Sequence, residues 1–173
     1  GADIVPMNGE NRIFAFYGLK QINTIPRESI KELIFLSKKE LSNITISDLV
    51  FLVAPRINAA GRIKHAKKAV DILIEKDSAT TRKLAANIDD WNNTRKLLEK
   101  KATEEALRAI NKNSNSIVVF NSNWHKGVVG IVASRIVETH YKPTIVLSEK
   151  DGILTGSARS VHGFDLYHAI SKC

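Results

Sequence analysis

Apolar residues recur at intervals of three and four through the first part of the chain, which is the spacing of an amphipathic helix. The sequence predicts a helix from Glu10 to about Ile22, with Asn8 as its cap, and a second from Glu28 to about Leu41. A third helix should begin at Thr45, a suitable cap residue with an acid three positions later. Pro55 should end this third helix.

The segment from Asp77 to about Asn113 contains neither proline nor glycine. The apolar residues in it follow one another at helical intervals, and Arg95 and Glu105 share their stripe: Leu84, Ile88, Trp91, Leu98, Ala102 and Ala109. The pattern predicts one long helix, about 50 Å at 1.5 Å per residue, which connects two domains. A coiled-coil dimer is the alternative, and the two charged residues disfavour it.

The last sixty residues combine strand patterns with helical patterns. Ile117–Phe120 and Thr144–Leu147 are apolar runs typical of buried strands, and the segment between them has helical spacing. A further strand from Ile153 to Arg159 follows at once, and a helix from Gly163 to Lys172 closes the chain. We therefore expect a mixed α/β fold, with a helical N-terminal part, a long connecting helix and a C-terminal β-α-β-β-α module.

The composition narrows the class of partner. The 173 residues include 26 Lys and Arg against 18 Asp and Glu, a formal net charge of +8, which favours phosphate-rich partners. The one cysteine excludes an internal disulfide and suits a reducing cytoplasm. No apolar run approaches the ~20 residues that span a bilayer, and the start of the chain is unlike a signal peptide. We expect a cytoplasmic protein with no membrane partner.

The first group of residues that could bind a ligand lies between Pro55 and Arg62, ahead of a helical pattern from Ile63 to Glu75. Arg56 and Arg62 beside a helix start would suit a cluster of anionic oxygens, because arginine donates in a planar fork and helix N-termini present N–H groups. Asn58 could cap that helix, and Gly61 could permit a close approach. The alternative is a surface turn whose arginines pair with carboxylates, with Arg56 holding the shape of the loop.

A second candidate lies on the last predicted strand. The two-residue period of a strand places Ser157 and Arg159 on one face, where a hydroxyl and a guanidinium make a good phosphate clamp. The alternative is a strand with ordinary solvent-facing polar residues.

The segment Trp124–Gly130 is a third candidate, because its glycines are expected to precede a helix. His125 could contact a phosphate, although a histidine beside a turn is more often structural. Trp124 could stack on a base, but core packing is the more common role of tryptophan. Arg135, with Ser134, could line the same groove.

Four segments carry a family resemblance, in this order: "ADIVPMNGENR", "FLVAPRINAAGR", "NWHKGVVGIVASRIVETHYKPTIVL" and "GSARSVHGFDL". Together they resemble the RecJ family of single-stranded-DNA-specific exonucleases, within the DHH phosphoesterase superfamily. The Asp-His-His signature of that superfamily and the family's later Gly-Gly-His element are absent from these residues. We therefore expect an internal piece of a longer enzyme.

The resemblance implies roles for single residues. Asp3 matches a metal-binding aspartate of the family, whose members use Mn²⁺ or Mg²⁺ to hydrolyse phosphodiester bonds in DNA recombination and repair. Arg62, Ser157 and Arg159 match residues that grip the 5′ phosphate of single-stranded DNA and set 5′→3′ digestion. One carboxylate cannot hold the pair of ions that such hydrolysis uses, so we expect this piece alone to be inactive. A single-strand-binding protein and a helicase are further candidate partners.

The resemblance also implies domain limits. Residues 1–76 would be the C-terminal end of the catalytic domain, 77–113 the connecting helix, and 114–173 an incomplete DHH-associated substrate-binding domain.

Two other functions remain open. One is a DHH-family phosphodiesterase of short oligonucleotides or cyclic dinucleotides, which the long connector disfavours. The other is a non-catalytic nucleic-acid-binding module.

Overall fold

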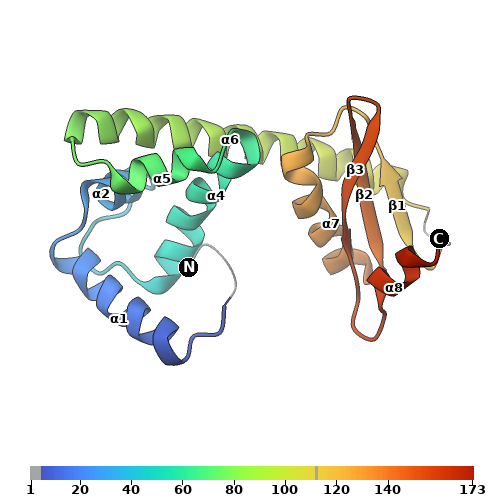
Figure 1. The fold of residues 1–173 in the computed structure, drawn as a ribbon, viewed down its shortest axis with the longest axis horizontal. Coiled ribbons are helices and arrows are strands. Elements are labelled where there is room, and N and C mark those ends of the chain that lie inside the picture. The colour runs from blue at the N-terminus through green and yellow to red at the C-terminus, as the bar shows by residue number, and fades with distance from the viewer. Residues whose placement is uncertain (1–4, 112) are drawn as a thin grey trace. The chain divides into compact units, whose positions relative to one another are not determined.

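The structure is a computed structural model that describes residues 5–111 and 113–173 (Figure 1). The chain divides into two compact units, Gly1–Thr94 and Arg95–Cys173, and the division falls within the long helix α6 (Ser78–Ala109). This helix confirms the prediction of an unbroken helix in that region. Each unit has its own hydrophobic core.

The first unit is helical. Besides the N-terminal part of α6 it contains α1 (Gly9–Thr24), α2 (Glu28–Phe35), α3 (Ile46–Asp48), a π-helical segment η1 (Leu49–Val53), α4 (Ala54–Ile63) and α5 (Lys67–Ile74). Its core is built from aliphatic residues of α2, α5 and α6, with Leu33, Ile34, Ile72 and Ile88 almost fully buried. The helical N-terminal part is as the sequence predicts.

The second predicted helix is shorter than expected. Helix α2 ends at Phe35 rather than near Leu41, because Lys38 adopts a left-handed backbone conformation with φ of 56°. The Ser37 hydroxyl also donates to the carbonyl of Leu33 at 2.9 Å and satisfies one of the open carbonyls at the helix end.

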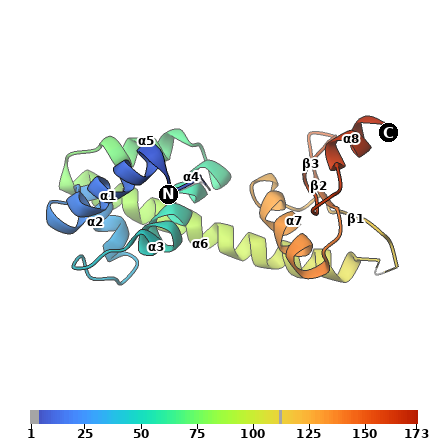
Figure 2. The ribbon, with the colours of Figure 1, turned by 90° about the horizontal axis from the view of Figure 1, so that it is seen from below.

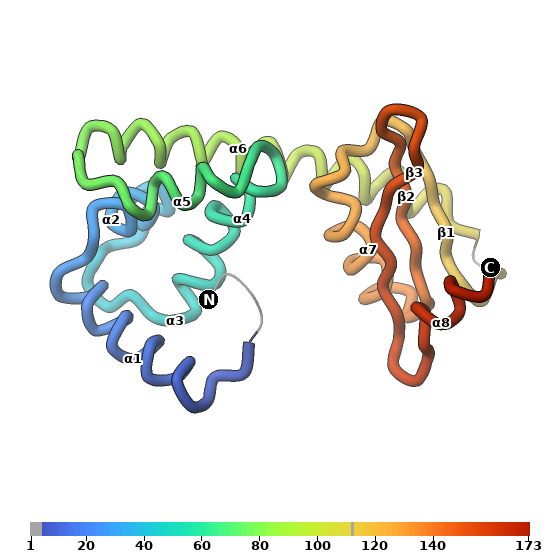
Figure 3. Tube along the Cα trace, in the orientation of Figure 1, coloured from blue at the N-terminus to red at the C-terminus, as the bar shows by residue number. Residues whose placement is uncertain are grey.

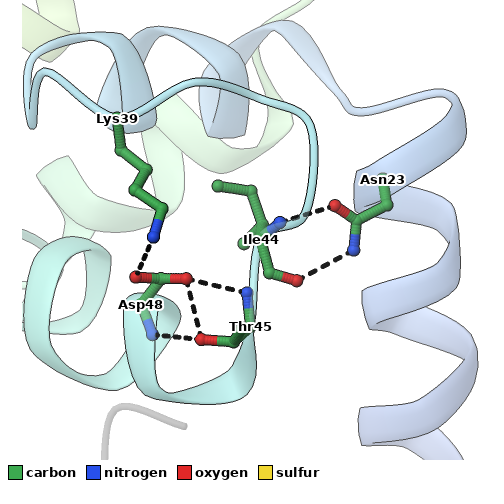
Figure 4. A network of polar contacts seen from close by, with 5 residues as sticks. All are labelled: Asn23, Lys39, Ile44, Thr45 and Asp48. Carbon is green, nitrogen blue, oxygen red and sulfur yellow. Dashed lines mark hydrogen bonds and ion pairs between the residues drawn. The ribbon is translucent and has the colours of Figure 1, made fainter.

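Thr45 caps a helix, as predicted. Its hydroxyl accepts the backbone N–H of Asp48, and the Asp48 carboxylate accepts the backbone N–H of Thr45 at 2.9 Å (Figure 4). Asn23 of α1 holds the preceding residue, since its side chain donates to the Ile44 carbonyl at 2.9 Å and accepts the Ile44 N–H at 2.7 Å. The two interactions fix the entry into α3.

The expectation that Pro55 ends this helix is wrong. The chain continues as a helix through η1 into α4, and Ala54 has helical torsion angles of −58° and −40°. In η1 the wider turn lets the Ala54 N–H donate to the Leu49 carbonyl, five residues back. Pro55 then occupies the first turn of α4, where a missing N–H costs little.

The second unit is the predicted β-α-β-β-α module, preceded by the C-terminal part of α6. Its elements are β1 (Ile117–Phe120), α7 (Lys126–His140), β2 (Thr144–Lys150), β3 (Ile153–Arg159) and α8 (Leu166–Ser171), the last shorter than predicted. The strand order is β1-β2-β3, with β1 parallel and β3 antiparallel to β2. The mixed α/β fold is confirmed.

Helix α7 and the C-terminal part of α6 cover one face of this sheet (Figure 2). Their core contains Ala106 of α6, Val132 of α7 and Val146 of β2, each fully buried. The tight turn from β2 to β3, visible in Figure 3, is made by Asp151 and Gly152 with φ of 55° and 75°, as in the hairpin turns that suit Asp-Gly. Within the described ranges no helix is long and apolar enough to cross a membrane.

Candidate anion-binding site

Arg159, at the end of β3, is held by hydroxyl groups on two elements. Its Nε donates to Oγ of Ser134 on α7 at 3.0 Å, and its Nη1 donates to Oγ of Ser157 at 3.2 Å. The Ser134 hydroxyl in turn donates to the carbonyl of Gly130 at 3.1 Å. This chain of hydrogen bonds orients an exposed guanidinium beside α7.

The register of the sheet explains why these side chains meet. Ser157 lies opposite Val146 and Arg159 opposite Thr144, and both partners on β2 face the core beneath α7. Ser157 and Arg159 therefore share the face of β3 that turns toward the helix, as the two-residue period predicts.

Gly130 makes room for this arrangement. A Cβ atom at Gly130 would lie 3.3 Å from Oγ of Ser157 and 3.6 Å from Nη2 of Arg159. The expectation that Gly127 and Gly130 precede the helix is wrong, since both lie inside α7, and sequence reasoning missed the role of Gly130. Only the crossing of β3 over α7 shows it.

The site keeps donors for a ligand. Among the residues with described positions, Nη2 of Arg159 and the hydroxyl proton of Ser157 have no hydrogen-bond acceptor. Both groups lie against Gly130. A guanidinium N–H and a hydroxyl that converge on one position suit an anionic oxygen cluster such as a phosphate.

His125 has a structural task. It is the N-cap of α7, and its Nδ1 accepts the backbone N–H of Gly127 at 3.0 Å. The neighbouring Trp124 is 6% exposed, and its indole N–H donates to Glu105 of α6 at 2.8 Å. Trp124 thus packs in the core, the more common of its two expected roles, and the turn before α7 is fixed to α6.

Arg135 lies one residue after Ser134 and pairs with a different group. Its Nε donates to Oε1 of Glu99 on α6 at 2.6 Å, while Nη1 of Arg95 donates to the other oxygen, also at 2.6 Å. The Glu99 side chain is 5% exposed, and that of Arg135 is 58% exposed.

The segment around Arg62 differs from its expected geometry. Residues 55–62 lie inside α4, so Arg62 occupies the last turn of a helix, where a cation is favoured, and not a helix start. Asn58, in the middle of α4, cannot be the cap of the following helix. Gly61 has no unusual torsion angle, and a Cβ there would meet Ala66 only at an ordinary 3.6 Å. Arg62 itself is exposed.

Arg56 is engaged within the first unit. Its Nε donates to Asp89 of α6 at 2.7 Å, and its two terminal nitrogens donate to the carbonyls of Leu52 and Leu36 at 2.6 and 3.3 Å. The side chain is 12% exposed. This geometry corresponds to the alternative in which Arg56 holds the local backbone.

The described residues do not form a metal site. Asp3, the expected metal ligand, lies outside the described residues. Within residues 5–111 and 113–173, no three or more His, Cys, Asp or Glu side chains are grouped so that they could hold a metal ion.

Known proteins resemble this chain in both sequence and structure. Residues 113–173 match the DHHA1 domain. The chain is 42% identical over 177 aligned residues to the single-stranded-DNA-specific exonuclease RecJ of Bacillus subtilis, covering 99% of this chain and 22% of that protein. It is 29% identical to RecJ from Thermus thermophilus, crystallised with Mg²⁺ or with Mn²⁺, with TM-scores of 0.86 and 0.87.

These two structural matches cover 98% of this chain, and 26% and 25% of the crystallised chains. The chain thus spans about a quarter of the length of these relatives. Over nearly all of its own length the chain is similar to part of RecJ, and its residues 113–173 match the DHHA1 domain.

Proposed function

We propose that this chain is part of a metal-dependent 5′→3′ single-stranded-DNA exonuclease that acts in recombination and repair, and that Ser157 and Arg159 hold the terminal 5′ phosphate of the DNA. The observation that carries the proposal is the pair of available donors, Ser157 Oγ–H and Arg159 Nη2, beside Gly130. The relatives, which are named single-stranded-DNA-specific exonucleases, support the choice of ligand.

A terminal phosphate suits this site better than an internal one. A phosphate monoester carries up to two negative charges and three terminal oxygens, whereas an internal phosphodiester carries one charge and two such oxygens. Arg159 can donate to one oxygen through Nη2 while Ser157 donates to another. Because Ser134 fixes Nε of Arg159, little side-chain entropy is lost on binding.

The remaining candidates take lesser roles in the proposal. Arg62 is a separate phosphate contact in the first unit, and Arg56 and Asn58 stabilise the helix that carries it. His125 holds the turn before α7, and Arg135 contacts DNA elsewhere on that helix.

For the domains, we propose residues 1–76 as the end of the catalytic domain, 77–113 as the connecting helix and 114–173 as the substrate-binding domain.

The metal, the location and the partners belong to the longer protein. RecJ crystals contain Mg²⁺ or Mn²⁺, and we propose that one of these ions serves the whole enzyme with Asp3 among its ligands. The upstream ligands are not in this sequence, so the chain alone should not hydrolyse DNA. The longer protein would act in the cytoplasm, with a single-strand-binding protein and a helicase among its partners.

Fluorescence anisotropy tests the end-recognition role. One labelled single strand carries either a 5′ phosphate or a 5′ hydroxyl, and the chain should bind the phosphorylated strand about 10- to 100-fold more tightly, as one or two charge-assisted hydrogen bonds imply. Arg159→Ala should abolish that preference. Arg108→Ala, an exposed arginine of α6, removes the same charge and should keep it.

Equal binding of both strands by the unmodified chain would overturn the assignment of Ser157 and Arg159. Binding that then depended only on salt would favour the non-catalytic nucleic-acid-binding module. Arg62→Ala, with Arg12→Ala as its matched control, tests the separate contact in the first unit.

A further inference from the structure

A groove of about 430 Å³ lies between α6 and α7 within the second unit. We call it the α6–α7 groove, and it is lined by Arg95, Lys96, Glu99, Lys100, Thr103, Glu104 and Arg135. Four of these residues are cationic and two are acidic, so the groove has a formal net charge of +2. None of them contributes to the cluster around Arg159.

The buried carboxylate of Glu99 is fully compensated inside the groove. Each of its oxygens accepts a guanidinium nitrogen at 2.6 Å, one from Arg95 and one from Arg135. A carboxylate that is 5% exposed requires such partners, because an isolated buried charge is costly. The triad of one acid and two arginines therefore keeps a net positive charge.

Two lysines add to that charge. Lys96 and Lys100 are exposed, lie four residues apart on α6, and so project from the same side of the helix. Within the part of the chain that the structure describes, neither forms an ion pair within 4.0 Å. Their ammonium groups are available to an anion.

Thr103 provides a second, independent observation. Its hydroxyl oxygen is buried and has no hydrogen-bond partner among the described residues. A threonine inside a helix commonly donates to the carbonyl four residues earlier, and this one does not. The oxygen has almost no surface open to the groove that Thr103 lines, so the side chain must turn about its Cα–Cβ bond before the hydroxyl can donate to a ligand oxygen there.

We propose that the α6–α7 groove binds an internal backbone phosphate of single-stranded DNA, in addition to the 5′ phosphate at Ser157 and Arg159. This inference rests on the proposed function for the identity of the ligand. Consecutive residues of α7, Ser134 and Arg135, serve the two positions, so one strand can extend from one to the other. Lys96, Lys100 and Arg135 supply the charge, and the Thr103 hydroxyl supplies a directed hydrogen bond.

The test uses a 5′-hydroxyl oligothymidylate, which makes no 5′-phosphate contact. Its dissociation constant is measured over a series of salt concentrations for the 173-residue chain and for Lys96→Gln/Lys100→Gln. The control, Lys20→Gln/Lys83→Gln, removes the same charge from two exposed lysines outside the groove. Thermal unfolding of each variant checks that the fold is kept.

We expect the groove variant to bind about tenfold more weakly at low salt. We also compare the slopes of the logarithm of the association constant against the logarithm of the salt concentration. The slope should become smaller in magnitude by about 1.4 in the groove variant, that is ~0.7 for each lost contact with a single strand. A groove variant that behaves like the control would overturn the proposal. Thr103→Val should also weaken binding without lowering the melting temperature, and unchanged affinity would remove the hydroxyl from the site.

The two proposals fail in different ways. The ratio of affinities for 5′-phosphate and 5′-hydroxyl strands reports only on Ser157 and Arg159, and the groove variant should leave it unchanged. A chain that shows no such ratio but keeps the effect of Lys96 and Lys100 retains the groove as a DNA contact and loses the end-recognition site. A loss of the ratio in the groove variant would contradict the independence of the two positions.

Discussion

The Nε atom of Arg56 lies 2.7 Å from Oδ1 of Asp89, and this ion pair joins α4 to α6 within the first unit. The side chains of the pair are 12% and 23% exposed, so solvent weakens the pair far less than it weakens a surface pair. Because Arg56 also donates to the carbonyls of Leu36 and Leu52, one guanidinium connects three segments of backbone.

Replacement of Arg56 by methionine should therefore destabilise the first unit. The change keeps an apolar stem but leaves one carboxylate and two carbonyls without their donor. We expect the free energy of unfolding in urea to fall by about 2 to 3 kcal/mol. Glu28→Gln is the control, because it breaks an exposed pair with Lys31 and should cost less than about 0.5 kcal/mol. Equal losses in the two variants would show that water replaces the donors of Arg56.

Long, regular patterns were predicted well from the sequence. The helix from Ser78 to Ala109 and the strand that ends at Arg159 lie close to their predicted limits, because each depends on local periodicity over many residues. The same period placed Ser157 and Arg159 on one face, and the structure joins the two side chains by a hydrogen bond.

Features that depend on tertiary structure were not predictable in this way. Pro55 lies inside a helical run because a π-helical turn precedes it, and a proline alone does not tell whether a helix ends before it or begins at it. Arg62 was expected at a helix start and lies at a helix end for the same reason. The contact of Arg135 with Glu99 joins residues 36 positions apart, and no local pattern could reveal it.

Gly156 should tolerate no side chain. A Cβ at this position of β3 would overlap the carbonyl oxygen of Val146 and lie 2.7 Å from Cδ2 of Leu147. Because the first of these atoms is backbone, the strands would have to separate, and we expect Gly156→Ala to cost about 2 kcal/mol or more in urea unfolding. Gly18→Ala, in a helix with no atom within 4 Å of the new Cβ, should instead stabilise by up to about 1 kcal/mol.

Gly130 allows a sharper test, because stability and binding should respond differently. A Cβ there would lie 3.3 Å from Oγ of Ser157, so the hydroxyl must move by a few tenths of an ångström. Alanine also favours the helix by up to about 1 kcal/mol, which should offset that strain. We expect Gly130→Ala to keep its melting temperature within a few degrees and to lose most of the preference for a 5′ phosphate. An unchanged preference would show that the Ser157 hydroxyl does not contact the phosphate.

Asp48 should titrate well below an ordinary aspartate. The backbone N–H of Thr45, then the Thr45 hydroxyl and Lys39, stabilise its carboxylate and lower its pKa from 3.8 to about 2 (Figure 4). A pKa that is lower in the folded state means that the charged form favours folding. This contribution is complete above about pH 4 and is lost as the pH falls toward 2. An NMR titration of the Asp48 carboxyl carbon measures the pKa directly.

Thr45→Ala separates the causes of that shift. It removes the hydroxyl but keeps the backbone N–H, which is the largest single cause, so the pKa of Asp48 should rise only part of the way back toward 3.8. Lys39→Gln should likewise raise it only part of the way, because both hydrogen bonds from Thr45 remain. A pKa near 3.8 in the unmodified chain would mean that the capping box at the start of α3 does not persist in solution, and the entry into the helix that carries Arg62 would then lack its anchor.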